Sequence, residues 1–186
     1  MENEQIKIIR SSRKTLAVQV RGTGLIVRAP YDTDTRQIRD FLQKHQRWID
    51  RHLQKAKYAD ETAQHEGMLT NEDIQKLADQ AKAVIPGRVS YFASLMGVSY
   101  GRITIRCQRS RWGSCTSKGN LNFNCLLMLA PPEVLDSVVV HELAHRREMN
   151  HSKRFYAHVL RVYPDYYKWN KWLKENGPAL IRRMTG

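Results

Sequence analysis

One predicted helix constrains the fold of this chain, because it joins an apolar run to three ionisable side chains. Pro131-Pro132-Glu133 predicts its start, since proline is tolerated in a first turn and an acid there suits the helix dipole. We expect the helix to continue to about Met149. Its first turns are apolar, through Val134, Leu135, Val138, Val139 and Val140. The helix should therefore be buried where His141, Glu142 and His145 follow, and unpaired ionisable groups are costly in such surroundings.

The spacing of the two histidines predicts a shared metal ion. Residues four apart on a helix differ by about 40° in azimuth and one turn in height, so His141 and His145 can bind one ion. Glu142 lies beside them, where its carboxylate can accept a proton from a water that the metal activates. Two imidazoles, a third protein ligand and a water complete a tetrahedral Zn²⁺ site with one open position. The pattern predicts a zinc-dependent hydrolase in which Glu142 is the catalytic base.

The sequence leaves three candidates for the third metal ligand. A glutamate on the next helix, used by one large class of such enzymes, is disfavoured because residues 149–174 contain none. His151 is the first choice, since it follows His145 by six positions, just past the expected helix end, where the chain can turn back. His158, Asp165 and a water molecule in place of a third protein ligand are the alternatives.

The chain divides by pattern into two parts. Three short alternating segments predict a small antiparallel sheet, at residues 5–10, 15–21 and 25–29. Helical spacing of apolar residues then predicts a helix over residues 34–57, and the polar stretch 59–67 predicts a linker. We expect an α+β protein with an N-terminal β/α extension, residues 1–66, and a catalytic domain, residues 67–186.

Helices and strands alternate in the second part. The expected helices and strands are a helix over 70–85, a shorter helix over 88–96, a strand over 101–108, a strand over 121–129, the apolar helix described above, a helix from near Ser152, and an aromatic tail that stops at Asn176-Gly177-Pro178. We expect the two strands to pair with each other.

The loop between these strands, residues 109–119, is a candidate substrate-binding segment. Arg109, Arg111 and Trp112 combine two guanidiniums with an indole, a composition suited to a carboxylate, a phosphate or a developing oxyanion. An equally good interpretation is a structural hairpin in which the tryptophan packs on the apolar helix and the arginines are solvated. The strand 121–129 could also present its edge to an extended peptide.

The chain is strongly basic. It has 31 Lys and Arg against 18 Asp and Glu, and it contains no carboxylate between Asp79 and Glu133. This excess predicts a local basic surface, which suits phosphate-rich partners, acidic substrates or anionic membranes without choosing among them.

The cysteines and the hydropathy indicate the compartment. Cys107, Cys115 and Cys125 are odd in number and form no Cys-x-x-Cys pair, so neither a disulfide framework nor a zinc ribbon is indicated. The sequence has no apolar stretch of the length that a membrane span requires. We therefore expect a cytoplasmic protein without a membrane partner.

Two segments together carry a family resemblance. The run from His141 to His145, continued by Asn150-His151-Ser152 and Phe155, follows the upstream segment Gln108-Arg109-Ser110-Arg111-Trp112-Gly113-Ser114-Cys115. This combination resembles the YgjP-like metallopeptidases, relatives of the SprT/Spartan zincins, over roughly residues 72–178.

The resemblance implies a zincin-like fold with a resident zinc ion. It implies that His141, His145 and His151 are metal ligands and that Glu142 is the general base, in agreement with the spacing. Tyr156 departs from the pattern, which has tryptophan there, and this should alter packing rather than chemistry.

Three functions remain open. The first is a zinc metallopeptidase acting on a polypeptide. The second is a nucleoside-triphosphate (UTP-type) pyrophosphatase with the same metal site, in which Arg109 and Arg111 bind the triphosphate, although no Gly-rich phosphate loop is present. The third is a DNA-associated Spartan-like protease or a non-specific nucleic-acid adaptor, and an adaptor would have a closed four-ligand zinc site. The sequence makes no prediction of oligomeric state.

Overall fold

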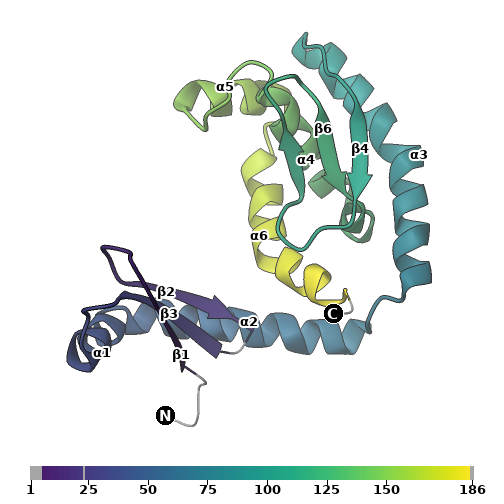
Figure 1. Ribbon diagram of the computed structural model, residues 1–186. Coiled ribbons are helices and arrows are strands. Elements are labelled where there is room, and N and C mark those ends of the chain that lie inside the picture. The colour runs from purple at the N-terminus through teal and green to yellow at the C-terminus, as the bar shows by residue number, and fades with distance from the viewer. Residues whose placement is uncertain (1–5, 23, 185–186) are drawn as a thin grey trace. The chain divides into compact units, whose positions relative to one another are not determined.

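The computed structural model describes residues 6–22 and 24–184, which form two compact units divided between Glu66 and Gly67 (Figure 1). Each unit combines helices with a small three-stranded sheet, which confirms the predicted α+β class. No helix among the described residues is long and apolar enough to cross a lipid bilayer.

The sheet of the first unit is mixed rather than antiparallel. It consists of β1 (Ile6–Ser11), β2 (Ala17–Arg21) and β3 (Gly24–Pro30), in the order β1-β3-β2. The hairpin strands β2 and β3 are antiparallel as predicted, but β1 pairs with β3 in parallel. The prediction was wrong for this pair because β3 lies between the other two strands, so β1 does not pair with the strand that follows it. Alternate side chains of β3 are buried, namely Leu25, Val27 and Ala29.

Two helices replace the single helix predicted over residues 34–57. Asp34 caps α1 (Thr35–Lys44) through a capping box, and α2 (Gln46–Glu66) begins directly after His45. The prediction of a linker over 59–67 was wrong, because α2 extends to Glu66. Its second half is held by small buried side chains at helical spacing, which a polar composition conceals: Ala56, Ala59 and Ala63.

The second unit begins with one long helix where two were predicted. Thr70 caps α3 (Asn71–Met96), and Gly97, with φ of 61°, ends it. Pro86 lies inside the helix and does not end it. Buried residues continue at helical spacing on both sides of Pro86, so packing outweighs the hydrogen bond that proline cannot donate: Leu77, Ala81, Ile85, Val89, Phe92 and Met96.

The second sheet is also mixed. Its strands are β4 (Ile103–Arg106), β5 (Gly113–Cys115) and β6 (Leu121–Asn124), in the order β4-β6-β5. The two predicted strands do pair, β4 with β6 in parallel, while β5 and β6 are antiparallel. The predicted strand over 121–129 ends early, because the Asn124 side chain accepts a hydrogen bond from the Leu126 amide and starts a 3-10 helix, η1 (Cys125–Leu129).

Helix α4 (Pro132–Ala144) is central to the second unit. It packs against α3, β5, α5 (Lys153–Val162) and α6 (Tyr166–Arg182). In Figure 1, α4 lies between α3 and α6. It ends before the predicted Met149, with His145 as its C-cap residue. The predicted stop at residues 176–178 was also wrong, because α6 continues through Gly177 and Pro178 to Arg182.

One partly buried ion pair joins α3 to α4, and its removal should destabilise the second unit. Arg88 donates two hydrogen bonds to Asp136, each 2.7 Å long, from Nε and Nη2. Asp136→Asn should lower the free energy of unfolding by about 1.5–3 kcal/mol, the range for a hydrogen bond to a charged group. Urea denaturation measures this loss.

The control substitution is Asp79→Asn, which removes an exposed pair with Lys82 at 2.9 Å. Such pairs contribute roughly 0–1 kcal/mol. Equal losses for the two variants would contradict the structural role of the Arg88–Asp136 pair.

Candidate metal centre

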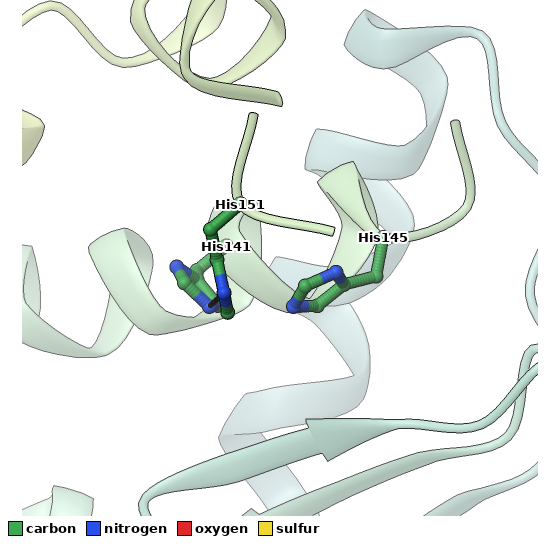
Figure 2. Close-up of side chains that lie close together, drawn as sticks. All are labelled: His141, His145 and His151. Carbon is green, nitrogen blue, oxygen red and sulfur yellow. Dashed lines mark hydrogen bonds between the residues drawn. The ribbon is translucent and has the colours of Figure 1, made fainter. Parts of the chain in front are cut away.

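Three imidazoles converge at the end of α4. His141 and His145 belong to α4 and its C-cap, and His151 lies on the segment before α5 (Figure 2). One ring nitrogen from each lies within 4.8 Å of the others, and the Nε2 atoms of His141 and His151 are 3.1 Å apart. Tetrahedral zinc with Zn–N bonds of 2.0–2.1 Å requires nitrogens about 3.3 Å apart. Three imidazoles are a donor set that suits zinc, and the separation of His141 Nε2 from His151 Nε2 is close to the tetrahedral value.

The early end of α4 brings His151 into this group. The chain turns after Ala144, and Ser152 caps α5 by accepting a hydrogen bond from the Phe155 amide at 3.3 Å. The Phe155 ring is fully buried, and its centroid lies 4.7–4.9 Å from those of all three imidazoles. Phe155 thus supports all three rings at once.

The alternative third ligands lie elsewhere. His158 belongs to α5, and Asp165 precedes α6 as its N-cap residue. Neither is a member of the group that contains His151.

The second ring nitrogen of each α4 histidine is occupied by a protein partner. His145 Nδ1 lies 3.1 Å from the Glu148 carbonyl oxygen, which can only accept, so Nδ1 carries the proton. His141 Nδ1 lies 2.8 Å from the Tyr166 hydroxyl, which also accepts a hydrogen bond from Asn170 Nδ2 at 3.1 Å. These contacts orient both rings with Nε2 left for a metal ion. The sequence analysis did not predict a role for Tyr166 and Asn170. Their spacing of one helical turn is the one feature of the sequence that could have indicated that they contact each other.

Burial sets the charge of the groups in the centre. Burial, reinforced by His145 and His151, lowers the pKa of His141 to about 4, and burial also lowers the pKa of His145. Both rings are therefore neutral near pH 7, the form that binds metal ions. Glu142 is 6% exposed, and burial raises its pKa to about 8. A cation bound nearby would favour the charged carboxylate.

Strand β5 approaches the Glu142 carboxylate very closely. A Cβ atom added to Gly113 would lie 2.6 Å from Glu142 Oε1, closer than real Cβ contacts allow. Only glycine leaves room for the carboxylate here. Within the described residues β5 pairs with β6 alone, so β5 is the edge strand beside Glu142. β6 is central and has no free edge, which excludes the predicted addition of a peptide to strand 121–129.

A buried asparagine holds the arginine loop. Asn124 Nδ2 donates hydrogen bonds to the carbonyl oxygens of Gln108 and Arg111, at 2.6 and 2.9 Å. The backbone N–H of Asn124 donates to the Trp112 carbonyl oxygen at 2.9 Å. The Trp112 ring packs against α6, where a Cβ atom on Gly177 would lie 2.8 Å from it. The loop is therefore held in place by the protein, as one of its two interpretations predicts, but the indole packs on α6 and not on the apolar helix that this interpretation named.

The same loop also lines a cavity beside the metal centre. The cavity has a volume of about 270 Å³, and its lining residues are Ser110, Arg111, Trp112, Gly113, Ser137, Val138, His141, Glu142, Tyr166, Asn170 and Leu173. Arg111 and Trp112, two of the three predicted substrate-binding residues, are thus placed next to His141 and Glu142. Arg109 is exposed and does not line this cavity.

The close approach of Gly113 to Glu142 makes a testable prediction. Gly113→Ala should displace the Glu142 side chain and lower the free energy of unfolding by about 1–3 kcal/mol, as overpacking does. A crystal structure and urea denaturation of the variant measure the two effects.

Gly87→Ala is the matched control. Gly87 lies within α3, and an added Cβ atom there meets nothing within 4 Å. This substitution should stabilise the protein by about 0.4–1 kcal/mol. An unmoved Glu142 in Gly113→Ala would refute the prediction.

A search of curated proteins found no match. Among solved structures, the chain is similar to the metallopeptidase zymogen abylysin of Pyrococcus abyssi, with 17% identity, a TM-score of 0.45, and coverage of 49% of this chain and 93% of that chain. It is also similar to the metallopeptidase zymogen jannalysin of Methanocaldococcus jannaschii, with 18% identity, a TM-score of 0.42, and coverage of 48% and 95%.

A family model provides the decisive comparison. The model of the YgjP-like metallopeptidase domain matches residues 14–76 and 71–176, most of the chain. This match confirms the resemblance found in the sequence, and it includes the converging histidines and Glu142. The chain therefore belongs to the YgjP-like metallopeptidase domain family, a family of metal-dependent hydrolases.

Proposed function

We propose that this protein is a zinc metallopeptidase in which His141, His145 and His151 hold the ion and Glu142 is the general base. The observation that carries the proposal is the group of three imidazole nitrogens within 4.8 Å, directly beside a buried carboxylate. Family membership supports peptide hydrolysis as the reaction class.

The chemistry of the donors favours zinc. Neutral imidazoles suit Zn²⁺, and three of them leave one tetrahedral position open for catalysis. When bound, zinc would polarise the scissile carbonyl and lower the pKa of a water to about 7.

The protein side chains divide the remaining work. The Glu142 carboxylate accepts a proton from the attacking water and then delivers it to the departing amine. Burial of Glu142 beside the Gly113 backbone restricts where this carboxylate can lie, so the proton acceptor is positioned before the substrate binds. Tyr166 and Asn170 hold the His141 ring in a fixed orientation during these steps.

Strand β5 and the arginine loop are proposed to bind the polypeptide. An extended peptide can pair with the free edge of β5, which would place its backbone next to Glu142. Arg111 and Trp112 line the adjacent cavity and contact the substrate there. Arg109, which is exposed on the same loop, is proposed to contact the substrate outside the cavity.

The decisive experiment compares the wild type with Glu142→Gln after zinc loading. Glu142→Gln should bind one zinc per chain as tightly as the wild type but hydrolyse unfolded casein about 10²–10⁴ times more slowly, the usual contribution of a general base. Zinc content is measured by mass spectrometry, and hydrolysis by the release of free amines.

Glu133→Gln is the control, because Glu133 lies in the first turn of the same helix and outside the cavity lining. It should behave as the wild type. Unchanged hydrolysis in Glu142→Gln would refute the proposal. The same proteins are incubated with UTP, since Arg111 beside the centre is compatible with a triphosphate. Release of UMP and pyrophosphate without peptide hydrolysis would replace the proposal with the pyrophosphatase function.

A second prediction identifies the third ligand. His151→Ala should weaken zinc binding by more than about 100-fold, because the loss of even an outer partner of a ligand costs 10–100-fold. Titration with a chelating competitor measures the dissociation constant.

His158→Ala is the matched control, since His158 is outside the group of three. It should leave zinc affinity unchanged. A strong loss in His158→Ala, or none in His151→Ala, would reverse the assignment.

A further inference from the structure

We propose that the cavity lined by Trp112, Val138 and Leu173, here called the Trp112 pocket, selects a large uncharged side chain next to the scissile bond of the substrate. The inference rests on the proposed peptidase function and assigns the class of residue at which cleavage occurs.

The Trp112 pocket adjoins the proposed catalytic groups. His141 and Glu142 are among its lining residues, so the pocket and the metal centre share a wall. Ser137 and Val138 precede His141 by one turn on α4, and they extend the pocket along this helix. A side chain seated in the pocket therefore belongs to a residue that flanks the bond under attack.

The walls of the pocket suit an apolar group. Trp112, Val138 and Leu173 are apolar, and the close contact with Gly177 restrains the indole. Two polar side chains in the lining already donate within the protein. Ser137 Oγ donates to the Val134 carbonyl at 2.7 Å, and Asn170 Nδ2 donates to Tyr166 at 3.1 Å. An apolar occupant would leave these donors satisfied.

The charges of the lining disfavour ionised occupants of either sign. Among the lining residues Glu142 is the only acid, and the proposed reaction uses it as the proton acceptor. A lysine or arginine of the substrate would have no further carboxylate to pair with and would meet Arg111. An aspartate or glutamate would pair with Arg111 but lie near the Glu142 carboxylate. An uncharged side chain avoids both penalties.

The volume of the pocket fits one side chain. At about 270 Å³ it is below the roughly 300–1,000 Å³ of pockets that enclose a drug-sized ligand. Leucine, methionine and phenylalanine are the substrate side chains expected there.

A binding experiment tests the pocket without catalysis. The zinc-loaded full chain carrying Glu142→Gln is titrated with N-acetyl-phenylalanine amide and with N-acetyl-lysine amide. The indole N–H resonance of Trp112, assigned by its loss in Trp112→Phe, should shift saturably with the phenylalanine amide alone. Equal shifts with both amides, or none with either, would overturn the inference.

A cleavage experiment tests which side chains the pocket accepts. The zinc-loaded wild type is incubated with a proteome-derived peptide library, and mass spectrometry should show large uncharged residues enriched at one position flanking the cut. Leu173→Ala enlarges the pocket, so the preference for tryptophan over leucine at that position should rise about 10-fold or more.

Leu77→Ala is the matched control for truncation of the core, because Leu77 and Leu173 are 8% and 7% exposed and only Leu173 lines the pocket. It should leave the preference unchanged. Cleavage without a side-chain preference would overturn the inference, as would an equal change of preference in both variants.

The two proposals fail differently. Saturable binding of the phenylalanine amide without any peptide cleavage would refute the peptidase function and retain an apolar pocket. Peptide cleavage without such binding would retain the peptidase and refute the pocket. Neither binding nor cleavage would refute both.

Discussion

The burial of two imidazoles and a carboxylate on α4 is the constraint on which the second unit depends. Unpaired ionisable groups in apolar surroundings would destabilise the fold, so each needs a partner or a change of protonation state. The Glu148 carbonyl and the Tyr166 hydroxyl partner His145 and His141, while burial keeps both rings neutral. Helices α3, α5 and α6 and strand β5 surround α4, so the core and the centre are built by the same contacts.

Local patterns in the sequence predicted the centre better than the fold around it. The spacing of His141 and His145 on an apolar helix depends only on helix geometry, and the structure brings both rings together. The structure also brings His151 to them, while its role as a ligand stays a prediction. The prediction of an antiparallel sheet was wrong for the pair β1 and β3, because strand order depends on contacts between residues distant in sequence. Tyr166 and His141 are 25 positions apart in the sequence, so no local pattern predicts the contact between them.

The misplaced helix ends have a common physical cause. Pro86, Gly177 and Pro178 usually end helices, yet each lies inside one here. Burial on both sides of Pro86, and the contact between Gly177 and Trp112, stabilise the continuous helices. These contacts join residues far apart in sequence, so propensity alone predicted the wrong boundary. In α2 the reverse happened, because buried alanines at helical spacing sustain a segment that resembles a linker.

The position of His151 has a mechanical consequence. His141 and His151 lie ten positions apart on either side of the turn that follows α4, and Phe155 on α5 contacts both rings. An ion held by both histidines would close this segment into a loop and cross-link α4 to the start of α5, much as a disulfide staple does. A bound ion would therefore stabilise the turn between α4 and α5, and loss of the ion would weaken the link between these two helices.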